Sequence, residues 1–190
     1  MDIETISQSL AHRTPITEDS VGALQAGVSI LLAPGPELLL IRRAEHPDDP
    51  WSGQIGLPGG TKENSDANLL VTAVRETQEE IEVSLPKASL LGQLDDFRPR
   101  RKSLPDVLIR PFVFALEEKP KTNCSDEVQY CVWSSMQNLL NSQAKREIEI
   151  TDGKRSVETY LAGEREVIWG ITYRILSGFF AALKLNQKLP

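Results

Sequence analysis

Residues 57–83 read LPGGTKENSDANLLVTAVRETQEEIEV, a glycine-containing turn followed by a segment of helical periodicity. Residues three and four apart lie on the same face of a helix, so Glu76, Glu79 and Glu80 project together. Arg75 lies one turn before Glu79. The opposite face is an apolar stripe that consists of Leu70, Ala73, Val74, Thr77 and Ile81. The stretch therefore predicts a helix that holds an acidic face against a hydrophobic core.

The turn before this helix contains two glycines, Gly59 and Gly60. Glycine permits a tight turn and a close approach of the backbone to its neighbours, so a main-chain carbonyl would reach the acidic face. Ser65 or Asp66 is placed to cap the start of the helix. The turn and the helix are thus expected to act as one unit.

The acidic face admits two interpretations. Crowding three carboxylates on one patch costs free energy unless a cation neutralises them, and carboxylates are the ligands that Mg²⁺ and Mn²⁺ prefer. A helix with a charged face that is simply solvated is an equally common arrangement. The residues of this helix, taken alone, leave both a divalent metal site and a solvent-exposed face open.

The composition of the chain is that of a soluble globular protein, with 40% hydrophobic and 25% charged residues. A length of 190 residues predicts one domain over residues 1–190, in which residues 1–20 form an N-terminal extension. The net charge of −6 disfavours nucleic-acid binding. An anionic substrate would therefore have to be held by a metal and by local basic groups.

The sequence contains neither an evident targeting signal nor a cysteine motif typical of redox or zinc sites. The N-terminal residues MDIETISQSLAHR lack the apolar core of a secretory signal, and Arg174 interrupts the apolar tail segment 167–185. We therefore expect a cytoplasmic protein that does not span a membrane. Cys124 and Cys131 belong to neither a CxxC pair nor a His–Cys cluster, so we expect buried free thiols rather than zinc or a disulfide.

The rest of the chain alternates between strand and helix signals. Pro111 interrupts the second strand of the central region, and a loop at 98–102 concentrates basic residues. The predicted elements are a short helix at 3–12, strands at 26–32, 37–43, 88–94, 107–116 and 128–133, a helix at 134–140, a hairpin within 146–161 and a terminal helix within 167–185. The basic loop has two interpretations: it holds substrate phosphates, or it is solvated and balances Asp95 and Asp96.

The spacing from Gly60 to Glu80 resembles the Nudix box, whose family pattern is G-x5-E-x7-R-E-U-x-E-E-x-G-U with U aliphatic. Residues 75–80, RETQEE, match the centre of that pattern. The departures are Asp66 in place of the first Glu with one extra residue before the arginine, Thr77 at an aliphatic position, and Glu82 in place of the closing Gly.

The extra residue and the aspartate resemble the coenzyme A pyrophosphatase branch of this family. Residues 38–60, LLLIRRAEHPDDPWSGQIGLPGG, are similar to the segment before the box in that branch, and residues 167–176, VIWGITYRIL, look like its IWG-x-T-x-x-I-L segment. Three differences are plain: the loop is one residue longer, Asp48 or Asp49 stands where the branch has a second arginine, and Leu57 replaces a phenylalanine.

The resemblance implies an α/β protein with the Nudix α/β/α sandwich and a mixed central sheet. It also implies a Mg²⁺- or Mn²⁺-dependent pyrophosphatase acting on a nucleoside diphosphate linked to another moiety, with coenzyme A or a derivative as the leading substrate. ADP-ribose, nucleotide sugars and nucleoside triphosphates are alternatives, as is a Nudix domain that senses a nucleotide without cleaving it. No nucleic acid or membrane partner is expected, and the sequence leaves a homodimer open.

The candidate site residues fall into three groups. Glu76, Glu79, Glu80 and the backbone of Gly59 would bind the metal; Glu76, Glu79 and Arg75 would serve catalysis; and Arg43, Arg98 and Arg100 would bind substrate. Arg75 would orient Glu79, while Asp66 is more distant and would instead cap the helix. Glu127, outside the box, is a further candidate for a base or an extra ligand, the alternative being an exposed loop carboxylate.

Overall fold

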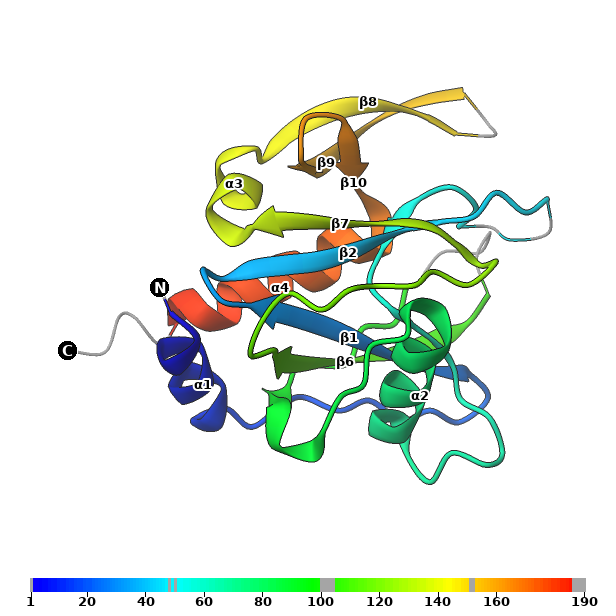
Figure 1. Cartoon of the computed structure of the whole chain (residues 1–190). Helices are drawn as coiled ribbons and strands as arrows, with labels where there is room; N and C mark the ends of the chain where they lie inside the picture. Colours follow the sequence, from blue (N-terminus) through cyan, green and yellow to red (C-terminus); the bar gives the residue numbers. More distant parts are fainter. Residues whose placement is uncertain (1, 48, 50, 100–104, 151–152, 186–190) are drawn as a thin grey trace.

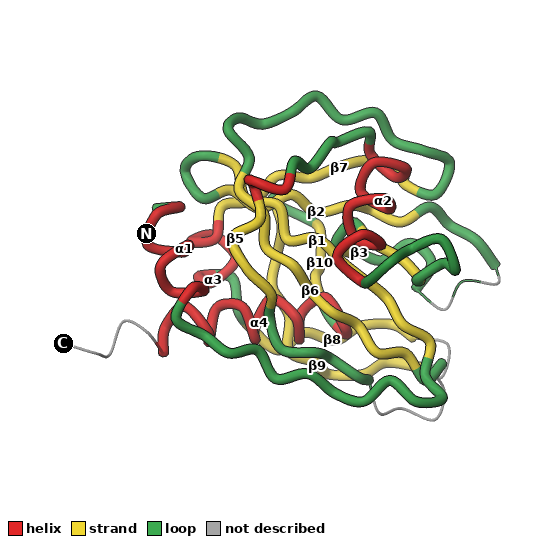
Figure 2. The backbone as a smooth tube through the Cα atoms, turned by 90° about the horizontal axis from the view of Figure 1, so that it is seen from below, coloured by secondary structure: helices red, strands yellow, loops and turns green. Residues whose placement is uncertain are grey.

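The fold is a mixed sheet placed between helices (Figures 1 and 2), in a computed structural model that describes residues 2–47, 49, 51–99, 105–150 and 153–185. Helix α2 (Leu69–Ile81) covers one face, and α4 (Gly170–Leu185) with α1 (Ile3–Ala11) covers the other. This arrangement confirms the predicted α/β fold with a mixed central sheet.

The central sheet contains seven strands in the described part of the chain. They are β1 (Leu24–Ala33), β2 (Glu37–Arg43), β3 (Ile55–Gly56), β4 (Gly59–Thr61), β5 (Leu90–Gln93), β6 (Val107–Ala115) and β7 (Val128–Ser135). The main path runs β3-β2-β1-β6-β5, with β4 paired to β1 and β7 paired to β2. Only the β1–β6 pairing is parallel among those described; the rest are antiparallel.

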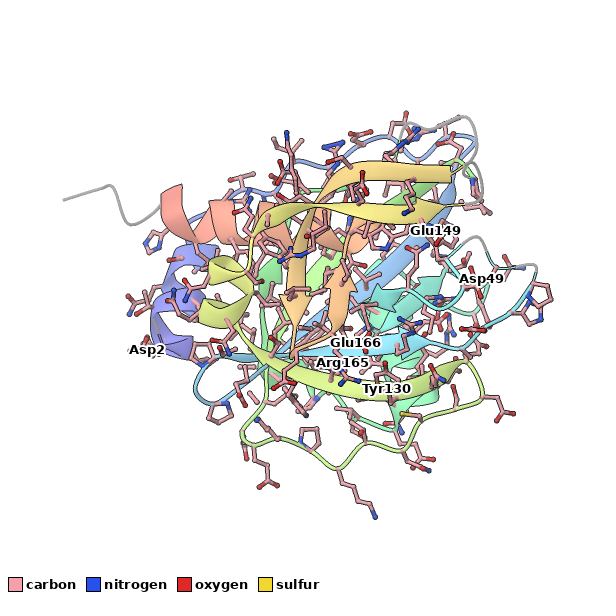
Figure 3. All side chains as sticks on the ribbon, turned by 90° about the horizontal axis from the view of Figure 1, so that it is seen from above. Asp2, Asp49, Tyr130, Glu149, Arg165 and Glu166 are labelled. Carbon is pink, nitrogen blue, oxygen red and sulfur yellow. The ribbon has the colours of Figure 1, made fainter. Side chains whose placement is uncertain are left out.

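A three-stranded antiparallel sheet lies beside the central one (Figure 1) and contains β8 (Ala144–Ile150), β9 (Gly153–Ala162) and β10 (Glu166–Ile168). It follows the short helix α3 (Met136–Asn141), and a short 3₁₀ turn (Lys87–Ser89) precedes β5. Tyr130 of β7 donates a hydrogen bond to Glu166 of β10 at 2.7 Å, and Figure 3 shows these two residues close together. The predicted hairpin within 146–161 is confirmed as β8 and β9.

Alternation along the central strands divides the core into two layers, because successive side chains of a strand point to opposite faces. Leu39 and Ile41 pack in the layer under α2, whereas Leu38 and Leu40 pack in the layer with α1 and α4. All four side chains are fully buried. Strand β2 is therefore apolar on both faces, which explains its unbroken hydrophobic run.

Gly27 of β1 sets the distance between the central sheet and α2. A Cβ atom at this position would lie 2.2 Å from the carbonyl oxygen of Leu69 and 2.9 Å from the nitrogen of Ala73. Only a glycine therefore lets the helix backbone approach the strand this closely. The close approach places the acidic face of α2 beside the turn at Gly59 and Gly60, which pairs with the same strand.

Several expected boundaries were wrong. Helix α2 is capped by Asn68, whose side-chain oxygen accepts from the backbone N–H groups of Leu70 and Val71, rather than by Ser65 or Asp66. The terminal helix begins at Gly170, because residues 166–168 form β10 instead. Strands β3 and β4 were also missed, since two or three residues are too short to show a periodicity.

Pro111 does not interrupt β6, which is continuous through it. Its carbonyl oxygen accepts from the N–H of Leu94, so the Pro111 backbone points toward the β5 side. The β5–β6 pairing ends at the Gln93–Phe112 pair, and the missing N–H of the proline therefore falls beyond the paired part of β5. Within the described ranges, no helix combines the length and the apolar character that crossing a bilayer requires.

Candidate active site

Helix α2 is closed at its C-terminus by an unusual backbone conformation. Glu82 adopts φ 55° and ψ 32°, and it is the only non-glycine residue with positive φ among those the structure describes. Its N–H donates to the carbonyl of Gln78. This residue takes the place of the box glycine, so the left-handed C-terminus is kept although the residue that normally permits it is absent.

Thr77, at the aliphatic position of the pattern, is fully buried between α2 and β1. Its hydroxyl donates to the carbonyl of Ala73 at 2.7 Å and lies 2.9 Å from the hydroxyl of Ser29, which is also buried. Both hydroxyls are hydrogen-bonded, so the substitution costs little desolvation free energy. The departure therefore affects packing under the helix and leaves the acidic face in place.

Arg75 organises the acidic face by contacting several groups around it. Its guanidinium bonds to Asp66 through Nε at 3.1 Å and Nη2 at 3.0 Å, and Nη2 also donates to the carbonyl of Thr61. Nη1 donates to Glu79 at 2.7 Å, and Nη2 lies 2.9 Å from Glu76. Arg75 is thus fixed from several sides and orients two glutamates of the box helix.

Asp66 is the buried anchor of Arg75, not a distant cap. It is 4% exposed and also accepts from the N–H of Glu63 and the hydroxyl of Thr72. Its bonds to Arg75 hold the pKa of the Asp66 carboxyl well below its usual range. The extra residue between Asp66 and Arg75 therefore does not prevent contact between the two side chains.

Glu80 is the most deeply buried carboxylate of the box helix, with 3% of its surface exposed. The N–H of Gly59 donates to one of its oxygens at 2.8 Å, and Nη1 of Arg43 lies 4.0 Å from the other. Gly59 has φ 147°, and a Cβ there would lie 2.4 Å from the carbonyl oxygen of Gly27. A side chain at position 59 would therefore clash with β1. Only a glycine lets the backbone N–H of this residue reach Glu80.

Gly60 makes room for Glu76. A Cβ at position 60 would lie 2.5 Å from the carboxylate of Glu76, so the backbone of the turn and this side chain are in direct contact. Glu76 is half-buried, whereas Glu79 is exposed at the end nearer solvent. The three glutamates thus cover a range of depths on one face of α2.

A second wall faces these glutamates across a cavity of about 270 Å³ that is open to solvent. It consists of Ser125, Asp126 and Glu127, which join the loop after β6 to β7. The N–H of Ser125 donates to the carbonyl of Glu80 at 2.9 Å, and that of Asn123 to the carbonyl of Ile81. This loop is therefore tied to the C-terminal end of α2 and brings Glu127 to the cavity.

Electrostatics in the cavity favour protonation of its buried carboxyls. Burial raises the pKa of Glu80 to about 8, against the lowering effects of the Gly59 N–H and of Arg43. Burial also raises the pKa of Glu76, and Arg75 partly offsets this rise. Glu127 contributes a repulsive charge to both groups. A cation in the cavity would remove this unfavourable interaction.

The side chains that line the cavity fit a hard divalent cation, because its candidate ligands are carboxylates, whose oxygen atoms such ions prefer. The pKa values of Glu76 and Glu80 are raised, so a nearby cation would stabilise their charged forms. Over the described residues, no group of three or more His, Cys, Asp or Glu side chains already has an arrangement that could hold an ion. Glu79 points to Arg75, and Glu80 accepts from Gly59. The site thus brings candidate ligands together, with Glu79 and Glu80 each hydrogen-bonded to a protein group.

The three arginines predicted to bind substrate have different surroundings. Arg43 does not line the cavity itself, but it lies beside Glu80 and bonds to Asp49 through Nε and Nη2. Arg98 bonds through Nε to Asp106 at 2.7 Å and does not line the cavity. Arg100 lies outside the described residues, as do Arg101 and Lys102.

The pairing partners of the basic loop differ from those expected. Asp95 bonds to Arg13 and Asp96 to Arg110, whereas the partner of Arg98 is Asp106. The residues that sequence reasoning missed are Asp49, Ser125 and Asp126. Cys124 and Cys131 are free and half-buried, with their sulfur atoms 3.7 Å apart, so the expectation of full burial was wrong.

The chain is similar in sequence to a known domain family and to several proteins. A family model described as NUDIX domain matches residues 23–153. The uncharacterised Nudix hydrolase NudL of Salmonella heidelberg is 29% identical over 168 residues, which cover 86% of this chain and 85% of the relative. An uncharacterised protein of Schizosaccharomyces pombe is 34% identical over 130 residues, 66% of this chain, but the match spans only 40% of that relative's length.

The fold is also found in solved structures. The crystal structure of a MutT protein from Methanosarcina mazei superposes with a TM-score of 0.58 and 17% sequence identity. The superposition covers 93% of this chain and 99% of that protein. At this level of identity the likeness establishes a shared fold.

Proposed function

Because the chain belongs to the NUDIX family and is a pyrophosphohydrolase of nucleotide-linked substrates, we propose that it hydrolyses the diphosphate of a nucleoside diphosphate linked to another moiety, with coenzyme A or a derivative as the leading substrate. Hydrolases of this family generally use divalent metals, and we propose Mg²⁺ or Mn²⁺ here. The cavity between α2 and the loop after β6 is the proposed site.

One observation carries the proposal: Glu76, Glu79 and Glu80 line a single cavity, and Glu127 lies on its opposite wall. A solvated acidic helix would not need a buried glutamate whose pKa is raised to about 8. Nor would it need an arginine held by a buried aspartate. The geometry therefore favours the metal site over the solvated face that the sequence left open.

The proposed mechanism assigns each group a task. Glu76, Glu79 and Glu80, which line the cavity, would hold the metal. The backbone of Gly59, whose N–H bonds to Glu80, lies beside them, and its carbonyl is a further candidate ligand. When bound, a divalent ion lowers the pKa of water and neutralises charge on the attacked phosphate. Arg75 is a positioning residue, because its bonds to Glu76 and Glu79 fix their orientation.

Proton removal from the attacking water needs a carboxylate. A carboxylate oxygen of Glu76 would accept this proton if Glu76 is not itself a ligand, and Glu127 on the opposite wall is the other candidate. Attack on one phosphorus then breaks the bond to the bridging oxygen of the diphosphate. The products are two phosphate monoesters, or a monoester and pyrophosphate when the substrate is a nucleoside triphosphate.

The substrate proposal rests on the resemblance of residues 38–60 and 167–176 to the coenzyme A branch. Trp169 and Gly170 of the second segment lie at the start of α4. The hydroxyl of Thr172 in the first turn of α4 donates to the carbonyl of Ile55 at 3.0 Å, so the two segments meet just before the glycine turn. ADP-ribose and nucleotide sugars are the alternative substrates.

A panel assay tests the proposal. The protein would be incubated with Mg²⁺ or Mn²⁺ and with coenzyme A, ADP-ribose, nucleotide sugars, dinucleotides and nucleoside triphosphates, and the products identified by mass. Release of 4′-phosphopantetheine and 3′,5′-ADP from coenzyme A is the expected result. Preferred cleavage of another member would contradict the coenzyme A assignment, and cleavage of none would favour a nucleotide-sensing domain.

A further inference from the structure

The loop after β2 folds back on itself and brings an acidic side chain to Arg43. The N–H of Arg43 donates to the carbonyl of Gln54, and the N–H of Gly53 to that of Ala44, so the loop is closed at its base. The N–H of Ala44 also donates to the carbonyl of Glu127, a residue of the cavity wall. The base of this loop is therefore fixed against the proposed active site.

Asp49 reaches back across this loop to Arg43 (Figure 3 labels Asp49). One of its oxygens accepts from Nε of Arg43 at 2.9 Å and from Nη2 at 2.8 Å. The other oxygen accepts from the backbone N–H of Trp51 at 2.9 Å. The Asp49 side chain is 16% exposed and that of Arg43 is 27% exposed, so the pair is partly shielded from water.

The two edges of the Arg43 guanidinium are used differently. Nε and Nη2 form the edge that Asp49 occupies, whereas Nη1 lies 4.0 Å from Glu80, a residue of the cavity. A planar guanidinium that is bound along one edge presents its remaining N–H groups in a fixed direction. Asp49 therefore decides where the free edge of Arg43 points.

We propose that Asp49 is a positioning residue that aims the free edge of Arg43 at a phosphate of the substrate. The inference rests on the proposed function, because it needs a phosphate in the cavity. An arginine side chain loses rotational freedom when it binds a ligand, and a partner that fixes it beforehand reduces that loss. Asp49 does not occupy Nη1, so the N–H groups of this nitrogen remain available for a charge-assisted hydrogen bond to a phosphate oxygen.

The test is Asp49→Asn, assayed with Mg²⁺ on coenzyme A and ADP-ribose. An amide keeps the size of the side chain but presents a neutral oxygen, so the hold on Arg43 weakens. KM is expected to rise about tenfold, the scale of one charge-assisted hydrogen bond, with kcat changed by less than about twofold. Asp49→Glu restores the carboxylate and is expected to recover most of the KM effect.

A matched control is Asp95→Asn, which removes the carboxylate partner of Arg13 away from the cavity. KM for this variant is expected to equal that of the wild type. Arg43→Lys keeps a positive charge but lacks the two-nitrogen edge, and it is expected to raise KM as Asp49→Asn does. An Asp49→Asn variant with the KM of Asp95→Asn would overturn the inference.

A measurement that needs no turnover separates this inference from the proposed function. The Nε–H resonance of Arg43 in a ¹H–¹⁵N spectrum, assigned by its loss in Arg43→Lys, is expected to be sharp in the wild type and broadened in Asp49→Asn. If the wild type hydrolyses nothing, the proposed function fails. The positioning of Arg43 by Asp49 is then decided by this resonance, and an unchanged signal in Asp49→Asn contradicts it.

Discussion

At the scale of single residues, Glu80 is both a buried carboxylate and a proposed metal ligand. It is nearly fully buried, it bonds to the N–H of Gly59, and it lies 4.0 Å from Arg43. A buried carboxylate with so few partners is costly when charged. Function and stability therefore make opposing demands on this side chain, and the two can be separated by mutation.

Glu80→Gln is expected to reduce metal-dependent turnover by about a hundredfold or more, because the variant loses a proposed ligand charge. The midpoint of thermal unfolding without metal is expected not to fall, since glutamine keeps an oxygen that can accept from Gly59 and cannot ionise in this buried position. Steady-state kinetics and calorimetry check both parts. The exposed Glu118→Gln serves as control, and normal turnover in Glu80→Gln would remove the assignment.

The stability of the metal-free protein should depend on pH through Glu80. The pKa of this carboxyl is about 8 in the folded state against about 4.5 in the unfolded chain, so the folded state binds the extra proton between these values. Stability is therefore expected to decrease as the pH rises from 4.5 to 8, and the raised pKa of Glu76 acts in the same direction. The lowered pKa of Asp66 acts only below this range.

Thermal unfolding in EDTA at several pH values measures this effect. The unfolding midpoint of the wild type should fall across the window, whereas Glu80→Gln should show a much flatter dependence. Equal slopes in the two proteins would show that other groups determine the pH dependence.

At the scale of elements, helix α2 has a side-chain cap at its N-terminus and one strained residue at its C-terminus. Asn68 caps its start, Gly27 allows its close approach to β1, and Glu82 closes it in a left-handed conformation. Such a conformation costs a non-glycine residue about 1–2 kcal/mol. The strain lies two residues beyond Glu80, and it can be relieved without touching the cavity.

Glu82→Gly is expected to stabilise the protein by about 0.5–1 kcal/mol, because the removed strain exceeds the extra entropy of glycine in the unfolded chain. For a domain of this size the unfolding midpoint should rise by about 1–4 °C, as measured by calorimetry. Glu82→Ala is the control, since it removes the same exposed side chain and keeps the strain. A rise of the same size in Glu82→Ala would point to charge rather than backbone conformation.

At the scale of the whole molecule, the cavity joins segments that are distant in the chain. The box helix supplies one wall, residues 125–127 supply the other, and the turn at Gly59 and Gly60 lies against the glutamates. A ligand that binds only the folded state stabilises all of these contacts together. A divalent metal should therefore act on global stability.

Addition of Mg²⁺ or Mn²⁺ at about a hundred times its Kd is expected to stabilise the protein by about 2.7 kcal/mol. This corresponds to a rise of about 5–10 °C in the unfolding midpoint, and EDTA should reverse it. The triple variant Glu76→Gln, Glu79→Gln, Glu80→Gln should show no such rise. A metal-induced rise of the same size in the triple variant would place the ion elsewhere.

Much of this protein follows from local sequence patterns. The alternation of apolar residues predicted the long strands and the box helix, because burial on one face imposes a period on the chain. The spacing of Glu76, Glu79 and Glu80 placed three carboxylates on one helical face, since helix geometry is fixed by residues a turn apart. The short strands β3, β4 and β10 were missed because two or three residues are too few to show a periodicity.

Local patterns and motif spacing are thus sufficient to predict the α/β class, the acidic helix and the family to which the chain belongs. The folded structure was needed to show that Asp66 anchors Arg75, that Glu127 faces the box glutamates, and that Asp49 bonds to Arg43. These contacts depend on how loops return to the sheet, and a loop carries no periodicity from which its path can be read. The reaction class can therefore be predicted from the residues of the box helix. The positions of the charged side chains around that helix depend on the tertiary structure.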